Sequence, residues 1–276
     1  MSEHHLSILG GGHMGRALIG GLLRSGTRPE RLSVGEAAGA ARLALGRDFG
    51  VSATADNARA VDGASVVVLA VKPQEAQAVV GGVAPLLRAQ RPLLLSIVAG
   101  VRTATLERWC GAGVPVARAM PNRPALLGAG ATALYARAAL GSELRAAAER
   151  IARAVGEIVW VPEEELLEVV TALSGSGPAY FFLLAELMAE AAAGLGLAAP
   201  VARRLAAATL YGSGLMAAAG DADLGRLRAE VTSKGGTTAA ALEVFASADL
   251  KGIVERALAA AARRGRELGQ EAQGHN

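Results

Sequence analysis

Six consecutive residues near the N-terminus, Gly10-Gly11-Gly12-His13-Met14-Gly15, have the spacing G-x-G-x-x-G. They follow directly on the apolar run Leu6–Leu9 and open a helix-like stretch that ends near Gly26. At a turn from strand to helix, such glycines let a pyrophosphate approach the backbone, and the helix N-terminus offers it N–H groups. The motif alone is weak in a chain with 35 glycines. Its position after a first strand nevertheless predicts a dinucleotide site.

Glu36 lies roughly 20 residues beyond that motif, at the end of the expected second strand, where an acidic residue commonly binds the adenosine ribose. A carboxylate there repels a 2′-phosphate and so favours NAD(H). Arg42, on the following helix, could instead reach a 2′-phosphate if Glu36 points away. A merely solvent-exposed Glu36 is an equal alternative, so these residues leave the cofactor preference open.

Two later turns also follow expected strands, namely Ala70-Val71-Lys72-Pro73 and Ser96-Ile97-Val98-Ala99-Gly100. Ligands of open α/β sheets bind beyond the carboxyl ends of the strands. We therefore expect both turns to face the nicotinamide half of the cofactor. Pro73 is suited to begin a helix, and Lys72 could either bind phosphate or be solvated.

A second candidate loop, Val231–Thr238, precedes an alanine-rich stretch in the C-terminal half. The paired glycines Gly235 and Gly236 can align several backbone N–H groups toward an anion, and the neighbouring hydroxyls add uncharged donors. Such a loop suits a small carboxylate. An ordinary helix cap made by Ser or Thr is the equally weighted alternative.

A third run of small residues, Leu173–Pro178, comes just before the most apolar helix-like segment. It lacks the lysine of a phosphate-binding Walker loop, and no histidine that could activate a serine lies in this half except His275. Its small residues, Ser176 among them, could allow close approach of nicotinamide or substrate, or simply tight helix packing.

Short apolar runs alternate with longer alanine-rich stretches up to about Val161, which is typical of a parallel sheet covered by helices. Strands are expected at Leu6–Leu9, Arg31–Val34, Val66–Ala70, Leu93–Ile97, Val114–Ala117, Ala131–Tyr135 and Ile158–Val161. After Pro162 only helices are expected, at Glu163–Val170, Pro178–Leu195, Pro200–Ala219, Thr238–Phe245 and Leu250–Glu267. The predicted fold is α/β, with a Rossmann-like dinucleotide-binding domain (residues 1–162) followed by an all-helical substrate-binding and dimerisation domain (residues 163–276).

The segment Pro178–Leu195 has charges only at Glu186 and Glu190, so nearly its whole surface requires burial. A helical domain of about 110 residues can hardly cover it alone. We therefore expect part of it to pack against a second copy of the chain, and an ordinary core helix is the alternative.

Composition narrows the class of protein. The 276 residues are 52% apolar, and the formal net charge of +3 arises from basic residues scattered along the chain, which argues against nucleic acid. Cys110 is the single cysteine, so a reducing cytoplasm is expected and the thiol should be buried and inert. The four histidines, His4, His5, His13 and His275, form no metal-binding pattern. The N-terminus lacks the layout of a signal peptide, and no charge-free run reaches the roughly 20 residues of a membrane span.

The chain resembles the pyrroline-5-carboxylate reductase family along nearly its whole length. The matching motifs are Gly10–Gly15, Ala70–Gln74, Ser96–Val101, Met120–Pro124, Thr171–Tyr180 and Val231–Thr238. The resemblance implies reduction of the cyclic imine of 1-pyrroline-5-carboxylate to L-proline, the last step of proline biosynthesis. It implies NADP(H) as the cofactor, with NAD(H) as the alternative, and dimers formed by the helical halves that assemble further, for example into decamers.

The resemblance also implies which residues bind each ligand. The expected cofactor contacts are Gly10, Gly12, His13, Met14, Gly15, Asn57, Ala70, Lys72 and Ala99, to which position adds Glu36, Val71 and Pro73. The expected substrate contacts are Ser176, Ser233, Gly235, Gly236, Thr237 and Thr238. Thr238 is the expected catalytic residue, because the resemblance places its hydroxyl near the ring nitrogen of the substrate. The hydroxyl could orient this nitrogen and could relay a proton to it.

Three residues depart from the family pattern. Lys234 replaces the usual proline before the paired glycines, which frees a backbone angle and adds a cation near the expected carboxylate. Arg123 stands where Thr is common, and Glu36 fits poorly with the family's frequent use of NADPH.

Two other functions remain as hypotheses. A β-hydroxyacid dehydrogenase would need a helix-borne catalytic lysine, which neither Lys234 nor Lys251 supplies in the expected setting. A non-enzymatic sensor of NAD(P)H would keep the first glycine loop but would not require the loop at residues 233–238.

Overall fold

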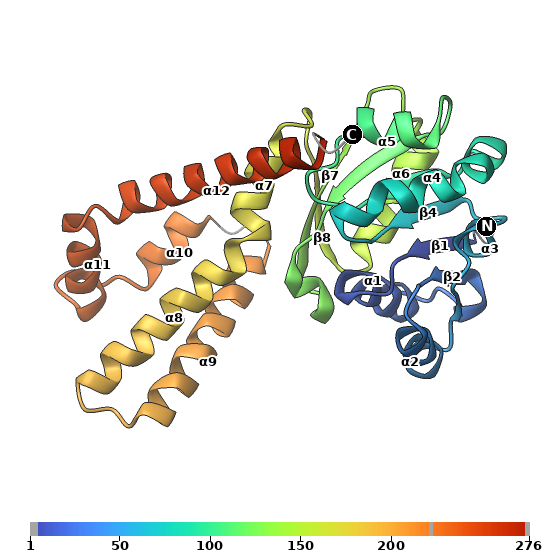
Figure 1. The fold of residues 1–276 in the computed structure, drawn as a ribbon. Helices are drawn as coiled ribbons and strands as arrows, with labels where there is room; N and C mark the ends of the chain where they lie inside the picture. The colour runs from blue at the N-terminus through green and yellow to red at the C-terminus, as the bar shows by residue number, and fades with distance from the viewer. Residues whose placement is uncertain (1–4, 221–222, 274–276) are drawn as a thin grey trace. The chain divides into compact units, whose positions relative to one another are not determined.

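A computed structural model describes residues 5–220 and 223–273, with side chains up to residue 269 at the C-terminal end. The chain forms two compact units (Figure 1): residues up to Gly175 together with those from Ala261 onward, and residues Ser176–Ala260. The last helix, α12 (Leu250–Gln273), begins in the second unit and ends in the first. The predicted division into folding domains at residue 162 stays a prediction. His4 and His275 lie outside the described residues.

The first unit is built on a sheet of eight strands in the order β3-β2-β1-β4-β5-β6-β7-β8. All neighbouring strands are parallel except β6 and β7. The strands are β1 (Leu6–Leu9), β2 (Leu32–Gly35), β3 (Ser52–Thr54), β4 (Val66–Leu69), β5 (Leu93–Ser96), β6 (Val116–Met120), β7 (Gly130–Ala136) and β8 (Gly156–Trp160). This is the predicted Rossmann-like α/β arrangement.

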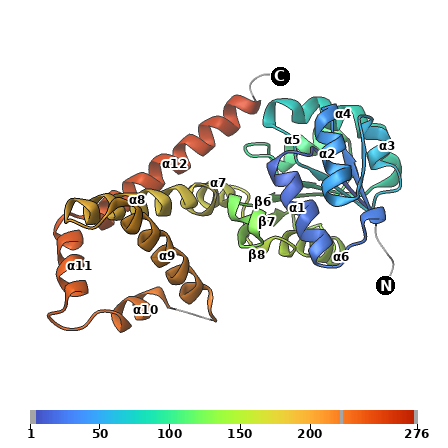
Figure 2. The same ribbon diagram turned by 90° about the horizontal axis from the view of Figure 1, so that it is seen from below.

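Helices cover both faces of this sheet (Figure 2). Alternate residues of β4 belong to different cores. Val66 and Val68 pack in one core with residues of α1 (His13–Arg24), α2 (Gly39–Phe49) and α6 (Ser142–Arg153). Val67 and Leu69 pack in the other core with residues of α3 (Asn57–Val61), α4 (Pro73–Gln90) and α5 (Thr103–Cys110). The short helix α7 (Leu166–Val170) follows β8. Burial on both faces explains why these strands are continuous apolar runs.

Three elements differ from the prediction. The edge strand β3 was missed because it is three residues long and only partly buried, so it has no apolar run. Residues Thr171–Gly175 form a π-helical turn that continues α7, a feature with no sequence signature. The short helix α10 (Leu224–Glu230), capped by Asp223, was also missed.

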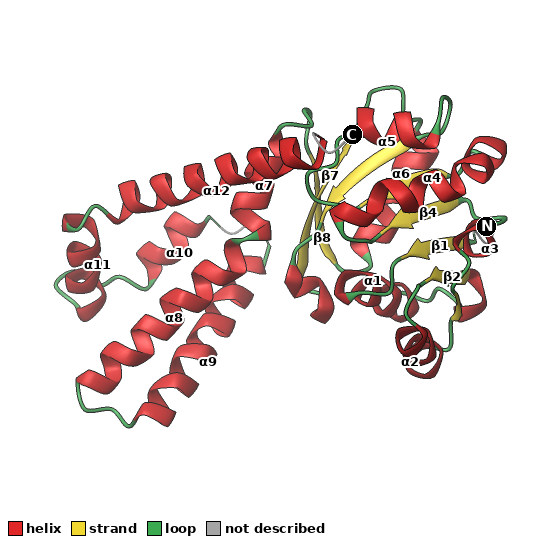
Figure 3. Ribbon diagram, viewed as in Figure 1, coloured by secondary structure: helices red, strands yellow, loops and turns green. Residues whose placement is uncertain are grey.

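In the second unit the described residues are all helices and loops (Figure 3). Its main helices are α8 (Gly177–Gly194), α9 (Ala199–Ala218) and α11 (Thr237–Ser247), and α8 packs along α9. Large apolar side chains of α8 are exposed in the single chain, among them Phe181 and Phe182 at 61% and 62%. An apolar surface of this kind marks an interaction site.

The continuous helical stretch Leu166–Gly194 is long and apolar enough to cross a bilayer by length and composition. No such stretch was expected from the sequence, because Glu168, Glu186 and Glu190 interrupt its charge-free runs. The core helices of soluble proteins meet the same criterion, so the stretch alone does not indicate a membrane protein.

Candidate functional site

The glycine loop connects β1 to α1, and its three motif glycines face different surroundings. Gly10 has a positive φ of 107°, and a Cβ there would clash with the carbonyl of Ala70. A Cβ on Gly15 would overlap the carbonyl oxygen of Gly10. Gly12 has nothing within 4 Å of its Cβ position. Two glycines are therefore required by packing, and the third faces the open space that a pyrophosphate needs.

The first turn of α1 is available for an anion. Its N-cap, Gly12, provides no side-chain hydrogen bond to the helix N-terminus, and His13 and Met14 are at least partly exposed. Backbone N–H groups of a first turn lack partners within the helix and carry the positive end of its dipole. The loop thus has the geometry expected of a phosphate-binding site.

Glu36 points toward the glycine loop. Its Oε2 accepts a hydrogen bond from the N–H of Gly11, and its Oε1 accepts one from Ala38, both at 2.8 Å. Arg42 donates to the backbone carbonyls of Glu36 and Ala37, at 2.8 and 2.6 Å. Arg42 was expected to reach a 2′-phosphate only if Glu36 pointed away from the site. Because Glu36 points toward the glycine loop, this condition is not met.

The remaining predicted cofactor residues of the first unit lie at the same edge of the sheet. The Asn57 side chain lies against Gly35 at the end of β2, so closely that a Cβ on Gly35 would clash with it. Ala70 donates its N–H to the carbonyl of Leu9 at 2.8 Å. Pro73 is the first residue of α4, as predicted, and Lys72 is its exposed N-cap.

Ala99 lies in the turn between β5 and α5. Ile97, the first residue of this turn, donates its N–H to the carbonyl of Leu69 at 3.0 Å, so the turn starts beside the end of β4. The structure thus gathers the predicted cofactor residues beyond the carboxyl ends of β1, β2, β4 and β5, where open α/β sheets bind ligands.

The predicted substrate loop belongs to the second unit and precedes α11. Gly235 has a φ of 70°, and Gly236 is the N-cap, with no side-chain hydrogen bond to the helix end. The alternative of an ordinary Ser or Thr cap is therefore wrong. A Cβ on Gly236 would clash with the hydroxyl oxygen of Ser233. The loop thus combines a hydroxyl with the uncapped N–H groups that begin at Thr237.

Ser176, the other predicted substrate residue, lies elsewhere in this unit. It is the N-cap of α8, where it makes no side-chain capping bond. Lys234, which lies within the substrate loop, is exposed and has no hydrogen bond or ion pair among the described residues.

Sequence reasoning missed a group of polar residues on and after β6. Asn122 donates from Nδ2 to the carbonyl of Ser174 at 3.0 Å and accepts a hydrogen bond from Ala131 N–H at 2.9 Å. Arg118 forms a buried ion pair with Glu164 at 2.8 Å. A charged residue within a strand was the only signal for this pair, because its partner is 46 residues away.

Cys110 is buried, and burial raises the pKa of its thiol to about 11. A thiol of such pKa stays protonated at neutral pH, which confirms the expected inert cysteine. Among the described residues no three His, Cys, Asp or Glu side chains are grouped so that they could hold a metal ion.

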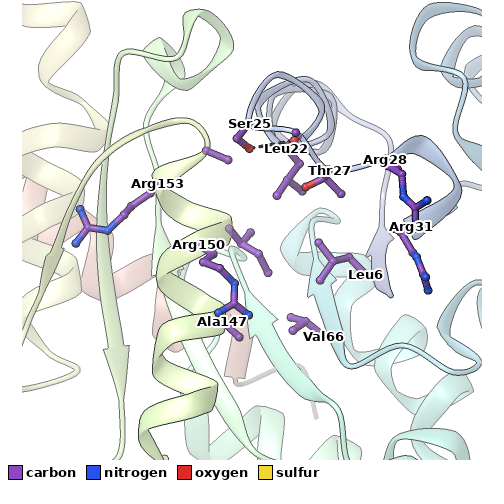
Figure 4. A pocket seen from close by; sticks show the side chains of 13 residues that line it. Leu6, Leu22, Ser25, Thr27, Arg28, Arg31, Val66, Ala147, Arg150 and Arg153 are labelled. Atoms are coloured by element: carbon purple, nitrogen blue, oxygen red, sulfur yellow. Dashed lines mark hydrogen bonds between the residues drawn. The ribbon is translucent and has the colours of Figure 1, made fainter. Parts of the chain in front are cut away.

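A hollow of about 850 Å³ lies at the opposite edge of the sheet (Figure 4). It is lined by Leu6 and Val66, the first residues of β1 and β4, and by side chains that include Arg150. The glycine loop and Ala70 follow the other ends of the same two strands. The hollow is therefore not part of the predicted dinucleotide site.

Two family models match separate parts of the chain. Residues 5–100 match the model described as NADP oxidoreductase, coenzyme F420-dependent, and residues 164–268 match that described as pyrroline-5-carboxylate reductase dimerisation. The pyrroline-5-carboxylate reductase of Pseudomonas aeruginosa is 40% identical over 98% of this chain and 99% of its own. The chain belongs to the pyrroline-5-carboxylate reductase family. The family member of Vibrio alginolyticus is 36% identical, with 97% and 98% of the two chains covered.

Solved structures of the family have the same fold. The pyrroline-5-carboxylate reductase of Coxiella burnetii has a TM-score of 0.93 and 38% identity, with 97% of this chain and 99% of that chain covered. The pyrroline carboxylate reductase of Plasmodium falciparum, solved with NADP bound, has a TM-score of 0.82 and 27% identity, with 98% and 99% covered. The chain is thus an oxidoreductase with a nicotinamide cofactor and a helical dimerisation domain that forms homo-oligomers.

Proposed function

We propose that this protein is a pyrroline-5-carboxylate reductase, which reduces 1-pyrroline-5-carboxylate to L-proline with NAD(P)H. The observation that carries the proposal is a pair of helix N-termini without side-chain caps, each preceded by a glycine loop. The relatives of the family match the chain over nearly its whole length. One loop opens α1 in the dinucleotide-binding unit, and the other opens α11 in the dimerisation region. Each suits an anion, the first a pyrophosphate and the second a carboxylate.

The cofactor residues divide between the two halves of the dinucleotide. Gly10, Gly12, His13, Met14 and Gly15 would bind the pyrophosphate through backbone N–H groups. Glu36 and Asn57, beside the end of β2, would contact the adenosine ribose. The turns that contain Ala70, Val71, Lys72, Pro73 and Ala99 would face the nicotinamide.

The substrate carboxylate would be held by Ser233, Gly235, Gly236 and Thr237, with Ser176 as a further contact. NAD(P)H supplies a hydride to the imine carbon, so that the C=N bond becomes a C–N bond and the nitrogen keeps its proton. A protonated imine is already a good hydride acceptor, and the main task of the protein is to position the two reactants. Thr238 would orient the ring nitrogen by a hydrogen bond.

The assembly follows from the same helices. We propose a dimer formed through α8 and its neighbours, whose exposed apolar side chains need a partner. We also propose that the dimers assemble further into a decamer and that the enzyme is located in the cytoplasm.

A direct assay tests the function. The purified protein is mixed with pyrroline-5-carboxylate and either NADPH or NADH, and loss of the reduced-nicotinamide absorbance is followed together with formation of proline. Consumption of either cofactor with one proline formed per cofactor oxidised supports the proposal. Consumption of neither contradicts it, and oxidation of a β-hydroxyacid by NAD(P)⁺ would favour the dehydrogenase alternative.

A further inference from the structure

Arg118, in the middle of β6, is a buried charge outside the predicted site. Its side chain is 4% exposed and that of its partner, Glu164, is 11% exposed. The Arg118 Nη1 donates to Oε1 of Glu164 at 2.8 Å. Among the described residues no other arginine or lysine is buried.

The other partners of Glu164 lie at the start of α5. Thr103, the first residue of α5, donates its backbone N–H to Oε1 and its hydroxyl to Oε2, both at 2.7 Å. The residue before it, Arg102, makes no side-chain capping bond. Glu164 therefore caps α5 from 61 residues further along the chain.

This carboxylate is charged at neutral pH. Burial raises the pKa of Glu164, but the hydrogen bonds from Thr103 and the hydrogen bond and charge of Arg118 outweigh it, so the pKa lies below its ordinary value. An ionised carboxylate at a helix N-terminus also interacts favourably with the helix dipole.

The six-residue turn 97–102, which contains Ala99, is held at both ends. At one end Ser96, the last residue of β5, pairs with Arg118 in the register of the sheet. At the other end Glu164 caps α5. Arg118 thus lies beside the start of the turn and, through Glu164, also restrains its end.

The middle of the turn is confined as well. Gly100 has a φ of 77°, and a Cβ there would lie 3.0 Å from the Cα of Gly269 in the C-terminal part of α12, which belongs to the same unit. The backbone of the turn therefore has little room to move on this side.

Stability alone is a poor reason for such a pair. A buried ion pair stabilises the folded protein little more than well-packed apolar residues would, because both charges lose their hydration. The Nε of Arg118 is also buried without a hydrogen-bond partner among the described residues, which adds a further cost. What the buried guanidinium does provide is a charge-assisted hydrogen bond from Nη1 that holds Oε1 of Glu164 in place.

We propose that Arg118 is a positioning residue of the reductase, which through Glu164 holds the turn 97–102 so that Ala99 presents a fixed backbone surface to the nicotinamide. This inference rests on the proposed function and on Ala99 as a cofactor contact. A misplacement of about 1 Å between reacting groups can lower a rate about 100-fold.

The test compares Arg118→Met, Glu164→Gln and the double variant with the unaltered protein. For each, we would measure kcat, KM, the isotope effect with NADPH deuterated at the transferred position, and the dissociation constants of NADPH and of 2′-phospho-ADP-ribose. The latter lacks only the nicotinamide ring, so its binding reports the contacts of the rest of the cofactor.

We expect Arg118→Met to lower kcat about 10- to 100-fold and to weaken NADPH binding while leaving that of 2′-phospho-ADP-ribose unchanged. The isotope effect should rise as hydride transfer becomes slower. Because Arg118 acts through Glu164, the losses of the two single variants should not add in the double variant. Arg118→Lys, which keeps the charge on a side chain of different shape, should recover part of the rate.

Val83→Ala serves as the matched control, because Val83 is a buried residue of α4 and its truncation weakens the core. It should lower the melting temperature with kcat retained. The proposal is overturned if Arg118→Met behaves like this control, or if the losses add fully. Should Arg118→Met not fold, Glu164→Gln decides: the proposal is overturned if it behaves like Val83→Ala in kcat, isotope effect and the two dissociation constants. An unaltered protein that reduces no pyrroline-5-carboxylate contradicts the proposed function instead, and the two dissociation constants still test the positioning of the nicotinamide.

Discussion

The carboxylate of Glu36 accepts a hydrogen bond from the backbone N–H of Gly11 at 2.8 Å, so an acidic side chain is built into the glycine loop. Its second oxygen is bound by Ala38 N–H at the same distance. Both bonds fix the charge beside the end of β2, where a dinucleotide places its adenosine ribose. A 2′-phosphate entering this region would meet a negative charge.

We therefore expect Glu36→Gln to shift cofactor preference toward NADPH. The amide can still accept the bond from Gly11 but carries no charge, so the ratio of kcat/KM for NADPH to that for NADH should rise about 10-fold, equivalent to about 1.4 kcal/mol. Initial rates with each cofactor measure this ratio. Glu30→Gln, at an exposed acidic residue before β2, should leave the ratio unchanged. An unchanged ratio in Glu36→Gln would mean that Glu36 does not select the cofactor.

Gly12 and Gly15 should respond differently to alanine. At Gly12 the added methyl group enters the open space assigned to the pyrophosphate, so the dissociation constant of NADPH should rise at least about 10-fold with an unchanged melting temperature. At Gly15 the methyl group would overlap the carbonyl of Gly10, so the melting temperature itself should fall. Titration calorimetry and thermal unfolding distinguish the two effects. Equal cofactor binding by Gly12→Ala and the unaltered protein would place the pyrophosphate elsewhere.

The parts of the site that the sequence predicted are those determined by residues close together in the chain or by the burial of a strand. The glycine loop, Pro73 at the start of α4 and the apolar strands β1 and β4 each depend on neighbours in the chain or on burial of both faces. The orientation of Glu36 depends on Gly11, which is 25 residues away. The pair of Arg118 and Glu164 joins a strand to the segment before α7, and no local pattern predicts such a contact.

The exposed apolar face of α8 should hold two copies of the chain together. Replacement of Phe181 and Phe182 by Asp should give a species with the 27.9 kDa mass of one chain in analytical ultracentrifugation, because charges are costly in an apolar interface. Leu43→Asp is the matched control, since Leu43 is 78% exposed on α2 in the other unit. It should leave the mass unchanged. A double variant that keeps the mass of the unaltered protein would show that the copies associate through another surface.

Thr238→Ala should slow the reaction without loss of cofactor. A hydroxyl that orients the ring nitrogen contributes to the chemical step, so kcat should fall about 10- to 100-fold, and the dissociation constant of NADPH should stay the same. Thr238→Ser, which keeps the hydroxyl, should retain most of the rate. Ser247→Ala, at the other end of α11, removes a hydroxyl that, within the described part of the chain, is bonded only to the carbonyl of Val244, and should have no effect on kcat. A Thr238→Ala variant with full kcat would remove this residue from the mechanism.

The lowered pKa of Glu164 predicts a pH dependence of stability. In the unfolded chain its carboxyl titrates near its ordinary value, about 4.3, whereas in the folded protein it stays ionised to lower pH. Its contribution to the free energy of unfolding is therefore complete above the unfolded pKa and is lost as the pH falls through the folded one. Urea unfolding between about pH 6 and pH 3 should show a smaller loss of stability for Glu164→Gln than for the unaltered protein, because the amide does not titrate. Glu157→Gln, at an exposed residue of β8, should keep the full dependence. If Glu164→Gln keeps it as well, the carboxylate is not held ionised by Thr103 and Arg118.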